Sequence, residues 1–376
     1  MYNRLCISVS IFTLIFTSAF LVSCQSPPKI IIKEVPVVMA SKPLTPSVIE
    51  YDLPDSILVC GEKIDLTNRA NFEMFEREFI ISVWDRAQVF MWLKRTGRFF
   101  PYFEKRLKAE GLPDDLKYLV VAESSLHTHI KSKAGALGIW QFMKETAKRY
   151  GLKVDRGVID ERLSYERSTD AAINYLKDLK EKFNTWLLVM AAYNCGENKL
   201  NEALKNQNEA YVNLDLPRET ERYVYRIAAI KYLMNNYDNF GYKLNKERVY
   251  KQVQTDVVKV DIKNRIYISD FVKQAEMKQK AFMDLNPQVL SSLLPLGQYE
   301  LRAPKGFDEK YKSALLLLSS KEYRIKTQGV NSTYTVRPGD ALYNISWETG
   351  IPVARIKRLN RLRGSRIYPG QKLVLK

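Results

Sequence analysis

Apolar side chains recur at helical spacing through the middle of the chain. The first such segment, residues 71–95, predicts one core helix capped by Asn71. Its apolar positions are Phe72, Phe75, Phe79, Val83 and Phe90. Helical patterns continue to about residue 240, separated by turn-forming Gly and Pro residues, with almost no alternating strand pattern. Residues 71–240 are therefore predicted to form a nearly all-α domain.

The pattern changes after residue 332. A strand-like segment at 334–336, two short helical segments and a closing strand-like segment at 371–375 predict a βααβ module over residues 332–376. The expected fold class of the whole chain is mainly α, with this small module at the C-terminal end.

The N-terminal segment predicts export. Arg4 precedes an apolar stretch that is too short and too weakly flanked for an ordinary spanning helix, so residues 1–24 are interpreted as a secretory signal, with an uncleaved membrane anchor as the alternative. The stretch ends in Leu21-Val22-Ser23-Cys24, which resembles the bacterial lipobox and implies that Cys24 is the lipid anchor. Gln25 favours the outer membrane, facing the periplasm. Residues 25–70 are proline-rich at their start and predict an extended tether.

Composition and charge narrow the function classes. With 376 residues, 46% of them apolar, the chain can bury one or two cores. The net charge of +17 suggests a polyanionic partner such as cell wall, lipid headgroups or nucleic acid. Export and the lack of a nucleic-acid motif argue against nucleic acid. With only two His and no CxxC or HExxH pattern, neither a metal nor a cofactor is expected. Whether Cys60 and Cys195 pair stays open.

A carboxyl group is predicted on the apolar face of a helix. After Pro113, with Asp114 as the expected cap, the apolar stripe continues to Glu123. The members of the stripe are Leu116, Leu119 and Val120. Because a buried carboxyl resists ionisation, the pKa of Glu123 should rise toward neutrality, as a glycosidic general acid requires. The alternative is a helix-terminal glutamate paired with an arginine.

Several ordered segments carry a family resemblance. They are Glu123-Ser124, Ser132, Gly135 to Met143, Ala192 to Gly196, and Pro217, Glu219, Thr220, Tyr223 and Val224. Together they resemble the soluble-lytic-transglycosylase family over about residues 97–235. Gly111-Leu112-Pro113 and Tyr150-Gly151-Leu152 resemble more narrowly its membrane-bound lytic murein transglycosylase D branch. The chain departs from the pattern at His127-Thr128 and at Cys195, which leaves the loop geometry there open.

This resemblance implies a lysozyme-like helical fold. It also implies cleavage of the β-1,4 bond between N-acetylmuramic acid and N-acetylglucosamine, leaving a 1,6-anhydro-muramyl end. Glu123 would act first as the acid and then as the base, assisted by the substrate's 2-acetamido group, so that no second carboxylate is needed. The residues implied in substrate binding are Ser132, Gln141, Tyr193, Asn194 and Glu219. For Glu219 a supporting salt bridge is an equal alternative.

The C-terminal module resembles the LysM domain, through segments such as Gly339-Asp340, Leu359-Asn360 and Pro369-Gly370. The resemblance implies binding of N-acetylglucosamine-containing chains, with candidates Gly339, Asp340, Ala341, Leu342, Ile367 and Tyr368. Residues 255–305 look like a degenerate copy, since Leu285-Asn286 parallels Leu359-Asn360. This copy lacks the Gly-Asp pair, so it is predicted to be a spacer.

Three alternative functions fit these sequence features. The first is a lytic transglycosylase acting on peptidoglycan strands, held to the membrane by its lipid. The second is a lysozyme-like hydrolase, which needs a second carboxylate from Asp155, Asp160 or Glu219 to activate water. The third is a wall-binding lipoprotein whose active site has decayed. The intact set of Glu123, Gln141, Tyr193 and Asn194 argues against the third.

Overall fold

The computed structural model describes residues 50–207, 211–263, 266–320, 333–349, 351 and 353–375. The chain divides into two units, residues 1–52 and 53–376. The predicted signal segment, Cys24 and the first part of the predicted tether lie outside the described residues. Within the described residues, no helix has the length and apolar character needed to cross a membrane.

A β-hairpin lies inside the predicted tether. Its strands, β1 (Ser56–Val59) and β2 (Glu62–Asp65), pair antiparallel. The Glu62 carboxylate accepts hydrogen bonds from the backbone nitrogens of Trp186 and Leu187, at 2.5 and 3.2 Å, and so satisfies free N–H groups at the start of a later helix. The expectation of an extended tether up to residue 70 is therefore wrong for residues 56–65, because the hairpin is held against the helical domain.

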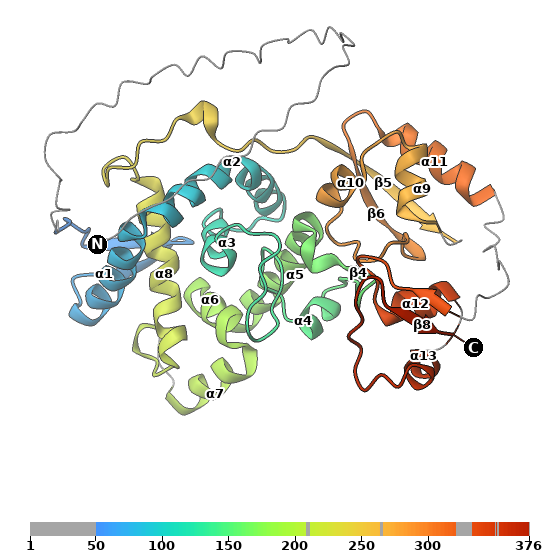
Figure 1. Cartoon of the computed structure of the whole chain (residues 1–376). Helices are drawn as coiled ribbons and strands as arrows, with labels where there is room; N and C mark the ends of the chain where they lie inside the picture. Colours follow the sequence, from blue (N-terminus) through green and yellow to red (C-terminus); the bar gives the residue numbers. More distant parts are fainter. Residues whose placement is uncertain are drawn as a thin grey trace, which may run out of the picture. The chain divides into compact units, whose positions relative to one another are not determined.

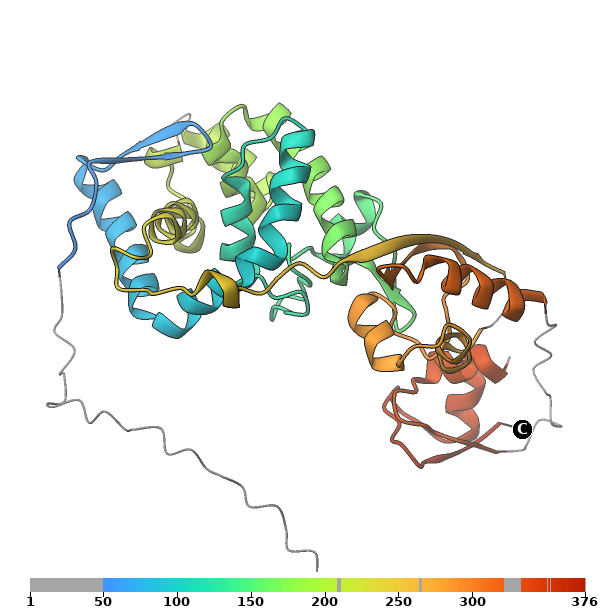
Figure 2. The same ribbon diagram turned by 90° about the horizontal axis from the view of Figure 1, so that it is seen from above.

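Helices make up most of the chain between residues 69 and 235, which confirms the predicted mainly α class. They are α1 (Arg69–Trp84), α2 (Arg86–Ala109), α3 (Leu116–Ser124), α4 (Lys144–Arg149), α5 (Tyr165–Phe183), α6 (Trp186–Cys195), α7 (Glu197–Gln207) and α8 (Arg218–Asn235), with single 3-10 turns at Glu161–Leu163, Tyr211–Asn213 and Lys246–Arg248. Helix α8 packs against α1, α3 and α6, and Figure 2 shows it nearly end-on beside α1. This arrangement brings side chains of α3, α6 and α8 together.

The single helix predicted over residues 71–95 is two helices. The chain breaks at Asp85, whose carboxylate accepts a hydrogen bond from the backbone nitrogen of Gln88 at 3.2 Å and caps α2. The cap of α1 is Asn68, whereas Asn71 is buried and accepts a hydrogen bond from the Tyr225 hydroxyl at 2.7 Å. The apolar periodicity predicts a single helix because the apolar stripe continues across Asp85.

The start of α3 also differs from the prediction. Asp114, the expected cap, forms an ion pair with Lys117 instead. Asp115 occupies the cap position, but its carboxylate accepts a hydrogen bond from the backbone nitrogen of Cys60 at 2.7 Å. Neither carboxylate therefore caps α3: Asp114 pairs with Lys117, and Asp115 binds the backbone of the hairpin.

The remainder of the described chain forms two βααβ segments (Figure 1). The first comprises β5 (Thr255–Ile262), α9 (Ile268–Gln274), α10 (Gln279–Leu285) and β6 (Gly297–Pro304), followed by α11 (Asp308–Ser320). The second comprises β7 (Thr333–Thr335), α12 (Leu342–Thr349), α13 (Val353–Leu359) and β8 (Lys372–Val374). Each has its own apolar core and one antiparallel strand pair. The predicted order of elements is present in both.

The first βααβ segment is bonded to a small hairpin of the helical domain, β3 (Val154–Asp155) and β4 (Ile159–Asp160). The Asp160 backbone nitrogen donates to the Gln288 oxygen at 2.8 Å, and Leu290 donates to the Val158 oxygen at 2.9 Å. Ile159 belongs to the apolar core of this segment. The segment therefore shares both backbone hydrogen bonds and core with the helical domain.

Candidate active site around Glu123

Glu123 is the penultimate residue of α3. The apolar stripe that precedes it is fully buried, while the Glu123 side chain is half-buried. Burial raises the pKa of Glu123 to about 7, in the direction that the sequence predicts. A carboxyl group with this pKa holds its proton in a large fraction of molecules at neutral pH, as a general acid must.

The partner of the Glu123 carboxyl is a tyrosine rather than an arginine. The Tyr223 hydroxyl, on α8, donates a hydrogen bond to Glu123 Oε1. Burial outweighs the opposing effects of this hydrogen bond and of the positive charge of Arg226, both of which lower the pKa of Glu123. The charge of Glu219 raises it. Among the described residues Glu123 forms no ion pair, so the alternative of a purely structural pair with an arginine does not hold here.

Tyr193 lies in the same cluster. Its hydroxyl donates to the Trp140 backbone oxygen at 2.7 Å. Burial raises the pKa of Tyr193 well above its usual value, and the negative charge of Glu123 adds to the effect. Burial and Glu123 raise the pKa of Tyr223 in the same way. Both hydroxyls therefore keep their protons, and Tyr223 donates a hydrogen bond to the Glu123 carboxyl while Tyr193 donates its own to the Trp140 oxygen.

The end of α3 is braced by its own backbone and by α2. The Ser124 hydroxyl donates to the Val120 oxygen at 3.1 Å, which is the bracing role that the sequence suggests. Ser125 follows with φ 53°, and its hydroxyl accepts a hydrogen bond from the Gln88 amide at 2.6 Å. The left-handed turn stops the helix directly after Glu123 and leaves the carboxyl at the helix end.

The loop over residues 132–142 is held by internal hydrogen bonds. Ser132 Oγ accepts from the Ala136 nitrogen at 3.0 Å. The Gln141 amide donates to the backbone oxygens of Gly138 and Ile130, at 2.7 and 3.1 Å. In these contacts Ser132 and Gln141 shape the loop, and their predicted role in substrate binding stays a prediction.

Arg162 also holds this loop, through hydrogen bonds to its backbone. Its buried guanidinium donates to the oxygens of Gly135 and Phe142, at 3.2 and 3.0 Å, and forms an ion pair with Asp160 at 2.8 Å. A Cβ at Gly138 would lie 1.9 Å from the Arg162 backbone oxygen, so close packing explains this glycine. Asp160 is thereby engaged in holding the loop, which weakens its candidacy as a second catalytic carboxylate.

Two further predicted residues lie at α6 and α8. Asn194 Oδ1 accepts a hydrogen bond from the Thr220 hydroxyl at 2.9 Å. Glu219 is exposed and forms no ion pair within the described ranges, so the salt-bridge alternative for it is not observed. It lies one helical turn before Tyr223, on the same face of α8.

Two regions of the chain match known protein families. Residues 101–214 match the transglycosylase SLT domain, and residues 334–376 match the LysM domain. The chain therefore carries an SLT domain and a LysM domain. The mainly α fold with a C-terminal LysM module is thereby confirmed.

Parts of the chain are also similar to individual proteins. The membrane-bound lytic murein transglycosylase D of Escherichia coli K12 is 29% identical over 293 residues, which cover 75% of this chain and 64% of that protein. This chain thus spans about two thirds of the length of that relative. The peptidoglycan transglycosylase gp16 of Escherichia phage T7 is 40% identical over 121 residues, 32% of this chain and 9% of the phage protein. The 70 kDa soluble lytic transglycosylase of Escherichia coli is 21% identical over 41% of this chain and 27% of its own, with a TM-score of 0.31.

Sequence reasoning missed two contributors to the SLT site. Tyr223 was recognised as part of a pattern but given no role, although it donates to the Glu123 carboxyl. Arg226 was not singled out, although its charge acts on Glu123 while its guanidinium donates to buried Glu78 at 3.0 Å. The spacing from Glu219 to Tyr223 and on toward Arg226 places them on one helix face, which is the signal that could have found them.

The LysM domain holds the six predicted glycan-binding residues in different environments. Asp340 accepts hydrogen bonds from the Tyr334 hydroxyl and the Arg337 nitrogen, at 2.9 and 2.7 Å. Leu342 is buried in the module's core and Ile367 packs against it, so Leu342 could meet a ligand only through its backbone, and its predicted role stays a prediction. Tyr368 is 61% exposed. Gly339, with φ 89°, and the half-buried Ala341 flank Asp340.

The two cysteines and Asp155 complete the set of candidate residues. Cys60 and Cys195 are free thiols, the first buried and the second half-buried. Asp155 is exposed on β3. Within the described part of the chain no group of three or more His, Cys, Asp and Glu is arranged to hold a metal ion.

Proposed function

We propose that this protein is a lytic transglycosylase that cleaves peptidoglycan between N-acetylmuramic acid and N-acetylglucosamine and leaves 1,6-anhydro-muramyl ends. The observation that carries the proposal is the Glu123 carboxyl, whose pKa is about 7, at the end of a helix within the SLT domain. The names of the relatives, which act on murein or peptidoglycan, support the same substrate class.

Glu123 would serve in both steps of the reaction. Its carboxyl proton passes to the glycosidic oxygen as the bond from that oxygen to C1 of the muramyl residue breaks. The substrate's acetamido oxygen stabilises the positive charge at C1. The Glu123 carboxylate then takes the proton of the C6 hydroxyl as O6 bonds to C1, which restores the acid. Tyr223 donates to the carboxylate that exists between the two steps.

The substrate-binding assignments belong to the proposal. Tyr193, Asn194 and Glu219 would contact sugar or acetamido groups beside Glu123, while Ser132 and Gln141 would act through the loop that they hold. The hydrolase is the second candidate, because the charge of Glu219 acts on Glu123 and a carboxylate near the acid could activate water.

The location and the anchoring are proposed on sequence alone. Cys24 would carry the lipid and hold the protein at the outer membrane, facing the periplasm, for wall remodelling. The LysM domain would bind the glycan, with the turn at Gly339 and Asp340 and the exposed Tyr368 as its contacts.

The decisive experiment is mass spectrometry of purified peptidoglycan digested by the chain without its signal segment. We expect anhydro-muramyl ends from the unchanged protein, none from Glu123→Gln, and anhydro ends still from Glu219→Gln. Reducing ends that disappear in Glu219→Gln would establish the hydrolase instead. Wall binding with no products would leave a binding protein.

The pH profile tests the acid directly. Because Glu123 must carry its proton, kcat/KM should fall about tenfold per pH unit above roughly pH 7. Tyr223→Phe removes a hydrogen bond that lowers this pKa, so the fall should begin at higher pH. A profile that does not move in Tyr223→Phe would contradict the proposed role of that hydroxyl.

A further inference from the structure

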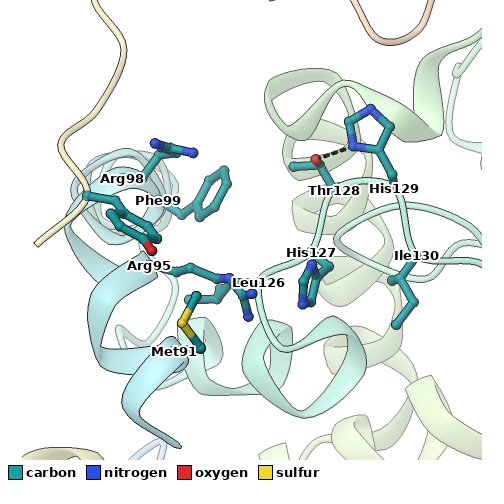
Figure 3. A pocket seen from close by; sticks show the side chains of 10 residues that line it. Met91, Arg95, Arg98, Phe99, Leu126, His127, Thr128, His129 and Ile130 are labelled. Atoms are coloured by element: carbon teal, nitrogen blue, oxygen red, sulfur yellow. Dashed lines mark hydrogen bonds between the residues drawn. The ribbon is translucent and has the colours of Figure 1, made fainter. Parts of the chain in front are cut away.

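A recess lies beside the loop that follows the catalytic helix. It has a volume of about 500 Å³ and lies between α2, residues 126–130 and Tyr250. Figure 3 shows Arg98 and Phe99 of α2 facing the loop segment that carries His127, Thr128 and His129. None of these residues is part of the proposed site around Glu123.

The two arginines of this recess lack acidic partners. Among the described residues neither Arg95 nor Arg98 forms an ion pair. Arg95 donates one hydrogen bond, to the Ser125 oxygen at 3.0 Å. Arg98 lies over the Tyr250 ring at 5.4 Å, and its buried Nε has no hydrogen-bond partner. A buried guanidinium nitrogen without a partner is costly, so this arrangement favours a bound anion.

The surroundings of the recess do not cancel its positive charge. Burial and the charge of Arg95 lower the pKa of His127, so its imidazole is neutral at neutral pH and the arginines carry the charge. A neighbouring cavity shares Arg98 and is also lined by Glu166 and Asp284. Glu166 forms an ion pair with Arg302 at 3.1 Å, and Asp284 forms one with Lys280. Both acids are therefore already paired with other cations, and an anion in the recess would meet unpaired guanidinium groups.

We propose that this recess binds a carboxylate of the peptide that the glycan strand carries, while Glu123 acts on the neighbouring glycosidic bond. The inference rests on the proposed function. Each muramic acid bears a short acidic peptide on its lactyl group, and a guanidinium matches a planar carboxylate with paired hydrogen bonds. Leu126 follows Glu123 by three residues, so at ~3.5 Å per residue the recess begins within about 10 Å of the acid along the chain.

The apolar part of the recess fits the same ligand. Phe99 and Tyr250 provide aromatic walls beside the arginines, and Met91 adds a flexible apolar surface. Alanyl methyl groups of the peptide can pack there while its carboxylate meets Arg98. A phosphate of a lipid or polymer offers similar charge but no apolar side chain, so the two sources are separable by experiment.

Binding is tested in the full chain without its predicted signal, carrying Glu123→Gln to prevent turnover. The probes are N-acetylmuramyl-L-alanyl-D-glutamate, its diamide and glycerol phosphate, each titrated by calorimetry. We expect the acid to bind at least about tenfold more tightly than the diamide. Arg98→Gln should remove this difference, while Lys105→Gln, which removes an exposed cation of the same helix, should keep it. Arg98→Lys, which retains the charge without the fork, should give an intermediate affinity.

Two outcomes overturn the inference. One is equal binding of acid and diamide, and the other is tighter binding of glycerol phosphate than of the acid. Circular dichroism and thermal unfolding show whether Arg98→Gln is folded, and Arg98→Lys gives the same comparison if it is not.

Cleavage separates this inference from the proposed function. With an intact Glu123, Arg98→Gln should lower kcat/KM on peptide-bearing strands about tenfold, mainly through KM, toward the value of the unchanged protein on peptide-free strands. If no strand yields anhydro ends, the proposed function fails, while the titration still decides the recess. If anhydro ends form but Arg98→Gln acts no differently from Lys105→Gln, the recess does not bind the peptide.

Discussion

The two βααβ segments close their last strand with the same device. In residues 255–304, Asn286 after the second helix accepts from the Arg302 nitrogen at 2.7 Å and donates to the Arg302 oxygen at 2.8 Å. In residues 333–375, Asn360 accepts from the Val374 nitrogen at 2.6 Å and donates to the Val374 oxygen at 2.7 Å. The shared geometry supports the prediction that the first segment is a degenerate copy of the second.

What differs is the use of the surface. The first segment buries Asn286 completely, takes Ile159 of the SLT domain into its core and pairs Arg302 with Glu166 of α5. The second leaves Asn360 half-buried and Tyr368 exposed. The first copy is therefore built into the framework of the SLT domain, while the second keeps an exposed face.

Breaking the link between the first copy and α5 should have the largest effect. Arg302→Met leaves Glu166, with its side chain 8% exposed, without its cation. An unpaired buried carboxylate costs about 3 kcal/mol, so the free energy of unfolding measured in denaturant should fall by about that amount. Arg355→Met removes an exposed arginine from the second copy and should change the free energy of unfolding by less than about 0.5 kcal/mol. Equal effects would mean that the two copies are not used differently.

The same variant should respond to pH. Burial raises the pKa of Glu166, and the charge of Arg302 opposes this. In Arg302→Met the pKa rises further, so the folded state binds a proton over a range in which the unfolded state has lost it. The free energy of unfolding then decreases as pH rises. The loss of stability should be greatest at neutral pH and shrink in acid. A loss that is independent of pH would place the destabilisation elsewhere.

Removing the shared asparagines gives a smaller contrast. Asn286→Ala removes a fully buried side chain and leaves the backbone N–H and C=O of Arg302 in β6 without this partner, so it should lower the free energy of unfolding by about 2–3 kcal/mol. Asn360→Ala acts at a half-buried site where water can replace the amide, so about 1 kcal/mol is expected. Hydrogen exchange of the β6 and β8 amides would show each effect locally. A larger loss for Asn360→Ala would reverse the comparison.

The raised pKa of Glu123, the proposed acid, is predictable from sequence because one helix sets its surroundings. The stripe that ends at Glu123 determines its burial, and burial dominates its pKa. Tyr223 lies 100 residues away and meets Glu123 only because α8 packs against α3, so periodicity could not assign it a role. The same reason applies to the recess at Arg98, whose walls come from α2, the loop after α3 and Tyr250.

Local boundaries were less predictable than elements, because distant groups compete for capping residues. Asp115 bonds to Cys60 of the hairpin, and Glu62 of the hairpin supplies the start of α6. Neither exchange leaves a mark on the local pattern. The hairpin itself was assigned to the tether because strands of four residues are too short to show alternation.

The smallest effect on stability, and the sharpest on binding, is expected at Tyr368. Its side chain is 61% exposed, so Tyr368→Ala should leave the free energy of unfolding within about 0.5 kcal/mol. Binding to purified peptidoglycan, measured by co-sedimentation, should nevertheless fall several-fold, because an exposed aromatic face can stack on a sugar ring. Leu296→Ala, at an exposed apolar position near the same turn of the first copy, should leave binding unchanged.

A basic surface could also hold the wall, so charge is tested separately. Arg363→Gln removes an exposed cation of the second copy. If wall binding depends on Tyr368 as a sugar contact, it should persist in Arg363→Gln and change little with salt. If it falls as much in Arg363→Gln as in Tyr368→Ala and weakens steeply with salt, the second copy is held by charge. In that case the exposed face, which distinguishes the second copy from the first, is an electrostatic surface rather than a sugar-binding site.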